Sequence, residues 1–403
     1  MSIARRLSEL PKAWSRRKIG EFAEVQTGST PNRNDPANYG GTIPWVTTTE
    51  VRDDVVLKTR ESLTERGQRM GRCKRFPAGS ILVAMYGQGA TRGRTALLGM
   101  DATTNQACAV VRPSPAYETR FLWWFLRAEY NTLRNLGRGG NQPNLNLGML
   151  RAFPVLLPPL PEQRRIADLL DRADAVRRKR QEAIKLTEEF LRSAFLEMFG
   201  DPVTNPKGWP VVRMAEVVTG TQYGTAEKAH GDGRGLPVLR MNNITYHGGL
   251  DLTSLKWCPV ADADLAKHTV RRGDLLFNRT NSPELVGKTA VWDRDDAFAY
   301  AGYLVRARFD RDRVQPEYVS GFLNSTYGKR YLFVKAKPSN NMSNFSASEF
   351  RRIPLPVPSI AVQNRFVRLL GTTRKSAAVL AASAELEDDL FNSLVQRAFK
   401  GEL

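Results

Sequence analysis

The stretch that decides the fold occurs twice in the chain. Residues 79–96 read GSILVAMYGQGATRGRTA, and residues 273–290 read GDLLFNRTNSPELVGKTA. Each copy opens with a glycine before a short apolar run and closes with glycine, a basic residue, threonine and alanine, at a constant shift of 194 positions. Solenoid units repeat every ~20–50 residues. The longer period here indicates two copies of a whole domain.

The repeat extends to both sides of this stretch. In each copy a proline-rich run then leads into a long helical pattern, so the chain of 403 residues divides into two similar halves. The further matching pairs are Trp14 and Trp209, Thr27-Gly28 and Thr219-Gly220, Asn141-x-x-Asn144-Leu145 and Asn341-x-x-Asn344-Phe345, and Pro154 and Pro354.

Each half is predicted to be a small mixed β-sheet with helices. In the first half, residues 81–85 and 107–111 are short apolar runs between glycine and proline breaks, which is typical of strands. Residues 121–126 favour a buried helix. In the second half, residues 275–277 favour a strand and residues 318–323 a helix.

The connectors differ in kind from the domains. The prolines of residues 153–161 exclude a helix there, because proline lacks a backbone donor and restricts the residue before it. Residues 162–199 then contain neither glycine nor proline and carry an apolar stripe at helical spacing. Such a helix is roughly 55 Å long at 1.5 Å per residue. A second, weaker stripe runs over 359–403 and contains Gly371.

Two such stripes most simply bury against each other as an antiparallel coiled coil. Arg180 and Thr187 interrupt the first stripe, and the alternative that each helix packs on its own domain stays open. The predicted fold class is α+β, with two similar domains separated by two long antiparallel helices. The predicted boundaries are 1–155 and 201–355 for the domains, and 156–200 and 356–403 for the helices.

The net charge of +19, from 60 Lys+Arg against 41 Asp+Glu, indicates a polyanionic partner. Nucleic acid is the leading candidate, and an anionic membrane surface is the rival. No apolar run approaches the ~18 residues that span a bilayer. Three cysteines far apart in sequence and the lack of an apolar signal region favour a reducing cytoplasm.

No catalytic constellation is evident in the sequence. Three histidines are too few and too scattered for a metal cluster, and neither a Walker A sequence nor the tetrapeptide of amino-methyltransferases occurs. The glycines of residues 87–93 are interpreted as a turn between strands. Glu284 and Lys288 faintly resemble a nuclease pair but are interpreted as solvated. The chain is therefore predicted to bind no cofactor or metal and to have no catalytic residue.

Polar side chains of the kind that reads base edges recur in the loops of both halves. Arginine pairs with guanine O6 and N7, asparagine and glutamine pair with adenine N6 and N7, and arginine and lysine also bind phosphates. Asparagine and threonine favour turns for backbone reasons as well. The predicted DNA-binding residues are Thr47, Thr49, Gln88, Thr91, Arg92, Arg94, Arg138, Asn141, Gln142 and Asn144 in the first half, and Arg240, Asn242, Asn243, Asn278, Arg279, Asn281, Lys288, Lys337, Asn340 and Asn341 in the second.

A basic run lies inside the first long helix at residues 177–180. A solvated helix face is one interpretation. Docking of a partner subunit or of phosphates is the other, and it assigns Arg177, Arg178 and Arg180 to that contact.

The chain resembles the specificity subunit of type I restriction-modification systems. The likeness is carried by residues 141–146 leading into the Pro154–Ala167 run, by the two repeated strands ending in Gly-(Arg/Lys)-Thr-Ala, and by the C-terminal residues 398–403. It covers essentially the whole chain. The second connector departs from the pattern, because it lacks the Pro-Glu-Gln of the first.

The resemblance implies two target recognition domains that each read one half of a split site in double-stranded DNA. The helices would set the gap between the halves and dock two methyltransferase subunits, and two restriction subunits can join. S-adenosylmethionine, ATP and Mg²⁺ would be held by those partners, and this chain would be non-catalytic. Because the two halves differ in nearly every polar loop residue, two different half-sites are expected.

Three other functions stay open on the sequence alone. A self-sufficient nuclease or methyltransferase is disfavoured by the missing motifs. A stand-alone DNA-binding or architectural protein would share the charge and the polar loops. A membrane-surface scaffold would share only the charge.

Overall fold

The computed structural model describes residues 11–87, 89–137, 144–339 and 342–403. The chain forms two compact units: unit 1 contains the residues up to 180 together with 383–403, and unit 2 contains residues 181–382. Each unit has several small sheets with short helices and takes part of both long helices, α5 (Leu160–Phe199) and α10 (Ile360–Ala398). The predicted α+β fold with two long helices is confirmed.

The central sheet of unit 1 has five strands in the order β2-β9-β6-β7-β4. The first copy of the repeated stretch supplies β6 (Ile81–Ala84) and β7 (Thr95–Leu98), which pair antiparallel and are fully buried. The predicted strands and helix of this half are confirmed as β6, β9 (Cys108–Val111) and α2 (Thr119–Ala128). The remaining elements are β1 (Ser15–Lys18), β2 (Val25–Thr27), β3 (Tyr39–Val46), β4 (Val55–Val56), β5 (Glu61–Leu63), α1 (Glu65–Met70), β8 (Thr103–Thr104), α3 (Tyr130–Leu136), α4 (Leu147–Arg151) and β10 (Pro154–Leu157).

Unit 2 repeats most of this topology, but within its described residues the main sheet lacks a strand equivalent to β4, and it has an additional sheet of order β16-β21-β20. Its main sheet has the order β12-β19-β15-β17, which matches β2-β9-β6-β7, and the sheet β14-β13-β18 matches β5-β3-β8. The predicted strand and helix are confirmed as β15 (Leu275–Asn278) and α7 (Pro316–Asn324). The other elements are β11 (Val211–Arg213), β12 (Val218–Tyr223), β13 (Leu236–Leu239), β14 (Lys256–Cys258), α6 (Leu265–His268), β16 (Thr280–Asn281), β17 (Thr289–Val291), β18 (Ala299–Tyr300), β19 (Leu304–Phe309), α8 (Thr326–Lys335), β20 (Lys337–Ser339), β21 (Met342–Asn344), α9 (Ala347–Phe350) and β22 (Pro354–Pro356).

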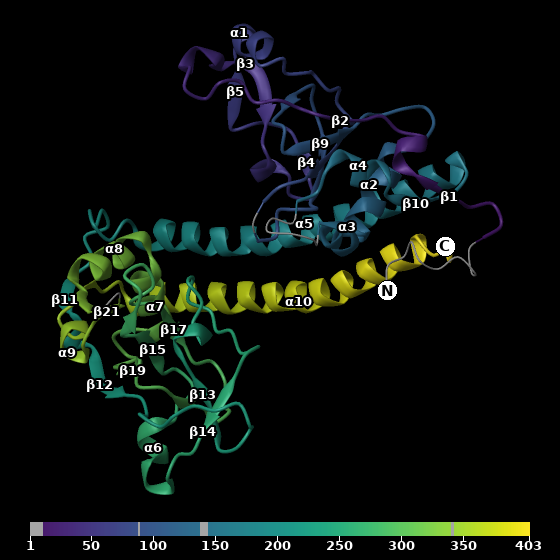
Figure 1. Ribbon diagram of the computed structural model, residues 1–403. Coiled ribbons are helices and arrows are strands. Elements are labelled where there is room, and N and C mark those ends of the chain that lie inside the picture. The colour runs from purple at the N-terminus through teal and green to yellow at the C-terminus, as the bar shows by residue number, and fades with distance from the viewer. Residues whose placement is uncertain (1–10, 88, 138–143, 340–341) are drawn as a thin grey trace. The chain divides into compact units, whose positions relative to one another are not determined.

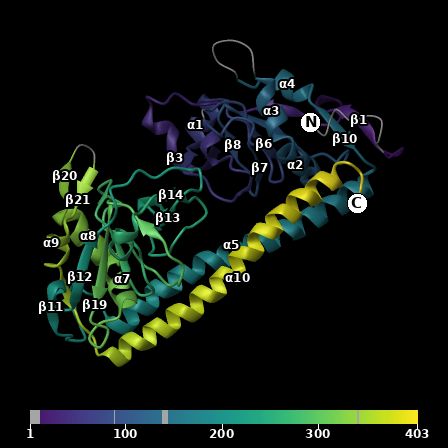
Figure 2. The same ribbon diagram turned by 90° about the horizontal axis from the view of Figure 1, so that it is seen from below.

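The long helices run antiparallel and side by side in both units (Figures 1 and 2). In unit 1, Arg165 donates to the carbonyl of Leu403 at 3.0 Å. In unit 2, the rings of Phe195 and Phe366 meet edge to face with centroids 5.4 Å apart. The predicted antiparallel pairing is therefore confirmed.

Three details of the helices differ from the sequence pattern. Helix α5 begins at Leu160, two residues before the stretch that lacks glycine and proline, because Pro161 falls in the first turn, where no backbone donor is needed. Gly371 does not interrupt α10. The two polar residues that interrupt the apolar stripe of α5 both have partners. Arg180 pairs with Glu387 on α10, and the Thr187 hydroxyl donates to the carbonyl of Ala183 at 2.8 Å.

Each core combines a sheet, a short helix and both long helices. In unit 1, Phe399 packs edge to face against Phe121 and Phe125 of α2. In unit 2, Phe199 packs in the same way against Tyr318 of α7. Figure 1 shows α7 between β17 and the long helices. All three cysteines are buried and unpaired, as expected of small core residues. Within the described residues, no helix has the length and apolarity to cross a membrane.

Candidate nucleic-acid interface

The predicted residues of unit 2 gather where β15 ends. The chain continues from β15 through Arg279 into β16, and β16 pairs antiparallel with β21. The backbone of Phe345 donates to the carbonyl of Arg279 at 2.8 Å, which fixes this edge. Strand β20, which contains Lys337, pairs with β21. Arg279, Asn281 and Lys337 are thus brought to one edge, and Asn340 and Asn341 lie outside the described residues.

Two of these side chains have the geometry of a contact surface. The guanidinium of Arg279 lies over the ring of Tyr223, 5.1 Å from its centroid. Lys337 is 78% exposed, and its ammonium is 3.1 Å from Glu349. An exposed ion pair of this kind is weak, so the ammonium remains available to a phosphate. Asn281 is mostly buried, and its amide oxygen accepts from the backbone of Ser282 at 2.9 Å.

Two exposed tyrosines at this edge were missed by the sequence reasoning. Tyr223 is 41% and Tyr303 is 50% exposed, and the carbonyl of Tyr303 accepts from the backbone of Arg279 at 2.9 Å. Aromatic faces can stack on bases or on arginine. No spacing in the sequence marks these residues, because their exposure follows from the pairing of distant strands.

Unit 1 builds the same edge with other side chains. The backbone of Leu145 donates to the carbonyl of Met85 at 3.0 Å, which is the counterpart of the Phe345–Arg279 bond. The turn predicted at residues 87–93 follows Met85. The Tyr130 hydroxyl stabilises it by donating to the carbonyl of Ala90 at 2.8 Å. Thr91, Arg92, Arg94 and Asn144 are partly exposed here. Gln88, Arg138, Asn141 and Gln142 lie outside the described residues.

A second pair of equivalent turns follows β3 and β13. In unit 1 the backbone of Thr47 donates to the Glu50 carboxylate at 2.8 Å, and in unit 2 the backbone of Arg240 donates to the Asn243 amide oxygen at 2.9 Å. Both close a short 3-10 turn. The turns leave Thr49 and Asn242 exposed. The same backbone shape therefore presents different polar groups in the two units.

Three predicted residues of unit 2 face the interior. Lys288 is 8% exposed, and its ammonium donates to the carbonyls of Met241 and Ile244 at 2.9 and 2.6 Å. Burial lowers its pKa. Asn243 is 1% exposed and Asn278 is fully buried. The Lys288 ammonium and the Asn243 amide are bound within the fold, because turn formation and base reading select the same residue types. Both polar atoms of the Asn278 side chain are buried without a hydrogen-bond partner among the described residues. The role of the exposed residues in DNA binding stays a prediction.

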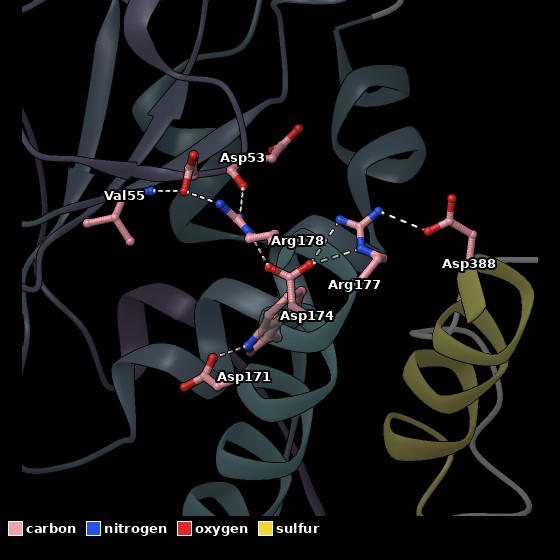
Figure 3. Close-up of polar contacts among 9 residues, drawn as sticks. Asp53, Val55, Asp171, Asp174, Arg177, Arg178 and Asp388 are labelled. Atoms are coloured by element: carbon pink, nitrogen blue, oxygen red, sulfur yellow. Dashed lines mark hydrogen bonds and ion pairs between the residues drawn. The ribbon is translucent and has the colours of Figure 1, made fainter. Parts of the chain in front are cut away.

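The arginines predicted to dock a partner have partners within unit 1 (Figure 3). Arg177 lies between Asp174, at 2.9 Å, and Asp388 of α10, at 3.3 Å. Arg178 bridges Asp174, at 2.6 Å, and Asp54, at 2.5 Å. Arg180 contacts Glu387 and Ser383. They therefore join α5 to α10 and to the domain, and their docking role stays a prediction.

Asp174 is the hub of this network and sets its pH dependence. Burial raises the pKa of its carboxyl, but the hydrogen bonds from Arg178 and Arg177 outweigh burial, and the net pKa is lowered. A lowered folded-state pKa contributes stability above the unfolded value of about 4, and this contribution is lost as pH falls through the folded pKa.

We expect Asp174→Asn to lower the free energy of unfolding by about 1–3 kcal/mol at pH 7, because two arginines lose a charged acceptor. Urea unfolding at pH 7 and pH 3.5 measures the effect, and the gap to the parent chain should narrow at the lower pH. The control Asp168→Asn alters a half-exposed carboxylate 2.9 Å from Arg120, with an expected cost of at most about 1 kcal/mol. A gap that widens on acidification would contradict the assignment.

Comparison with known proteins shows which proteins this chain is similar to. Residues 11–186 match the family described as "Type I restriction modification DNA specificity domain". The EcoKI specificity subunit of Escherichia coli (strain K12) is 21% identical to this chain. The alignment covers 98% of this chain and 90% of the E. coli protein. In sequence the chain is similar to type I restriction-modification specificity subunits.

Solved structures of specificity subunits share the fold. The S subunit of M. genitalium aligns with a TM-score of 0.62 at 13% identity over 99% of both chains. A chain of the type I system solved for its complex assembly and conformational transition aligns with a TM-score of 0.56 at 21% identity over 98% of this specificity subunit and 99% of that chain. The specificity subunit is the non-catalytic recognition component of its enzyme.

Proposed function

We propose that this specificity subunit reads a split DNA site, with one half-site assigned to each unit. The supporting observation is the duplicated edge: the bonds of Leu145 to Met85 and of Phe345 to Arg279 build the same backbone frame, on which the side chains differ. Because the two edges have the same backbone arrangement, we expect both units to approach the duplex in the same way. Because their side chains differ, we expect them to read different base sequences. The recognition domains are then residues 1–155 and 201–355.

The long helices are proposed to fix the unread gap and to dock two methyltransferase subunits. Helix α5 has 40 residues. At 1.5 Å per residue it is about 60 Å long, against about 34 Å per turn of duplex DNA. The methyltransferase subunits would hold S-adenosylmethionine, and restriction subunits that join them would use ATP and Mg²⁺. The target adenine would be flipped into the partner's pocket.

Selection of bound sequences from a random duplex library tests the proposal. The purified complex of this subunit with its methyltransferase should enrich a motif of two different short blocks at a constant distance. A single continuous block, or a palindrome, would contradict it.

Lys337 is expected to bind a phosphate without reading sequence. We predict that Lys337→Ala weakens binding to all sequences alike and reduces the slope of log K against log salt by about 1. Lys375→Ala on α10 is the control, because it removes the same charge from an exposed position away from the proposed reading edge. Titrations of both variants at several salt concentrations measure the slope. Equal changes in the two variants would show that Lys337 acts only through net charge.

A further inference from the structure

A cavity of about 470 Å³ opens in unit 2 between α5, α7 and α10. Its apolar wall includes Leu191, Phe195 and Phe366, and Glu317 and Arg374 supply charged groups. Leu196 at the cavity is 50% exposed. The volume lies within the range of ordinary ligand pockets, ~300–1,000 Å³.

The internal repeat identifies what fills the equivalent place in unit 1. Gln163 donates to the carbonyl of Pro158 and accepts from the backbone of Glu118. Gln363 makes the same two bonds with Pro358 and Gln315. The long helices therefore correspond at a shift of 200, and α2 corresponds to α7 at a shift of 197. The packing of Phe399 on Phe121 and of Phe199 on Tyr318 agrees with both shifts.

In unit 1 this place is filled by large aromatic and arginine side chains. The indole of Trp124 donates to Asp171 at 2.8 Å and meets the ring of Phe391 with centroids 5.6 Å apart. The guanidinium of Arg127 lies 4.1 Å from the centroid of Trp124, and that of Arg177 lies 5.2 Å from the centroid of Phe391. Trp124 is only 2% exposed.

In unit 2 the corresponding positions carry small or shorter residues. Those lining the cavity are Ser320, Gly321, Asn324, Ala377 and Leu191, which replace Trp123, Trp124, Arg127, Arg177 and Phe391, respectively. Phe195 takes part of the space, since a Cβ on Gly321 would lie 2.7 Å from its ring. The rest is the cavity. Unit 2 thus keeps the frame of unit 1 but lacks the side chains that close it.

The polar groups of the cavity suit the kind of side chain that is missing. The Oε2 atom of Glu317 is buried and has no hydrogen-bond partner among the described residues. The Arg374 guanidinium donates to the carbonyl of Gly248 at 2.8 Å. A buried acceptor favours a donor, and a buried guanidinium favours the face of an aromatic ring. In unit 1, Trp124 has both properties, with its N–H on a carboxylate and its ring beneath Arg127.

We propose that this cavity receives an aromatic side chain with a hydrogen-bond donor, tryptophan or tyrosine, from a partner protein that docks on unit 2. The shape is that of a side-chain site, because the repeat fills it with side chains in unit 1. Among the described residues of unit 1, Trp124, Arg127 and Phe391 occupy the equivalent place, so the insertion occurs on unit 2 only. The two halves then contact their partners unequally even where their backbones match. The inference does not depend on which DNA sequence is read.

The test is a titration of the full chain with N-acetyl-L-tryptophanamide. We expect one site per chain with a Kd on the order of 0.1–1 mM, as suits a ligand of this size. N-acetyl-L-leucinamide should bind at least about tenfold more weakly, because it has neither ring nor side-chain donor.

Matched variants locate the site. Ala377 lines the cavity, whereas Ala378, its neighbour on α10, is exposed and does not. Ala377→Trp should weaken binding at least about tenfold and Ala378→Trp less than about twofold, so the two losses should differ by at least about fivefold, or ~1 kcal/mol. Circular dichroism melts confirm that both variants fold, and Glu317→Leu offers a second substitution that leaves the cavity open but removes the acceptor.

Three results of the titrations would overturn the proposal, and a fourth would come from self-association of the chain. They are no saturable binding up to ~20 mM, equal weakening by the two tryptophan variants, and tighter binding of free zwitterionic tryptophan than of the capped amide, which would indicate a metabolite site. Self-association of the parent chain that only Ala377→Trp abolishes would assign the cavity to a second copy of this chain and likewise overturn the partner assignment.

Discussion

Replacing Arg279 by alanine is expected to weaken DNA binding by about 5- to 150-fold, or ~1–3 kcal/mol, and to relax specificity at one base position of one half-site. Arg279 lies at the end of β15, held by its backbone bonds to Phe345 and Tyr303, with its guanidinium over Tyr223. This leaves the planar guanidinium preorganised for a bidentate contact, so its loss removes base reading as well as charge.

Arg272→Ala is the matched control for this variant. Arg272 is 56% exposed, precedes the same strand at its other end, and forms an ion pair with Asp295. It carries the same charge at a position outside the proposed reading edge. Binding of both variants to the selected motif and to single-base substitutions of it, at one salt concentration, measures the difference. Equal losses, or a loss spread over both half-sites, would contradict the assignment of Arg279.

Replacing Phe399 by alanine is expected to destabilise unit 1 by about 3–5 kcal/mol. Its side chain is fully buried and packs edge to face on Phe121 and Phe125, although 274 positions separate Phe399 from the nearer of the two. Removing the ring opens a new cavity in the core of unit 1 and leaves the packing of unit 2 unchanged.

Hydrogen exchange distinguishes this outcome from general destabilisation. Amides of α2 should lose protection while those of α7, in the other unit, keep theirs. Leu390→Ala on α10, the helix that ends just before Phe399, is the control, since Leu390 is 59% exposed and its truncation should cost less than about 0.5 kcal/mol. Equal loss of protection in α2 and α7 would contradict the assignment of Phe399 to unit 1.

The fold was well predicted from the sequence, because the chain contains two copies of the same domain pattern. The strands at Ile81–Ala84 and Leu275–Asn278 each follow a glycine, Gly79 and Gly273, and a long segment without glycine or proline predicts a helix with little ambiguity. The proline run of residues 153–161 was predicted to exclude a helix, but α5 already includes Leu160 and Pro161, because proline is tolerated in a first turn.

The candidate site was less predictable, because the residue types that read DNA bases are also the ones that stabilise turns. Lys288 and Asn243 match the pattern of polar loop residues, but their buried side chains donate to backbone carbonyls. Tyr223 and Tyr303 were missed, since only the pairing of distant strands exposes them beside Arg279. Periodicity does not report which side of a turn a side chain faces.

The most direct test of split-site reading is single-molecule sequencing of modified adenines in host DNA, with and without the gene for this subunit. The account predicts methylated adenines in two different short blocks at a constant spacing, which disappear on deletion and return on complementation. In the Arg279→Ala strain, only one block should change. A continuous or palindromic motif, or methylation that persists without the subunit, would contradict the account.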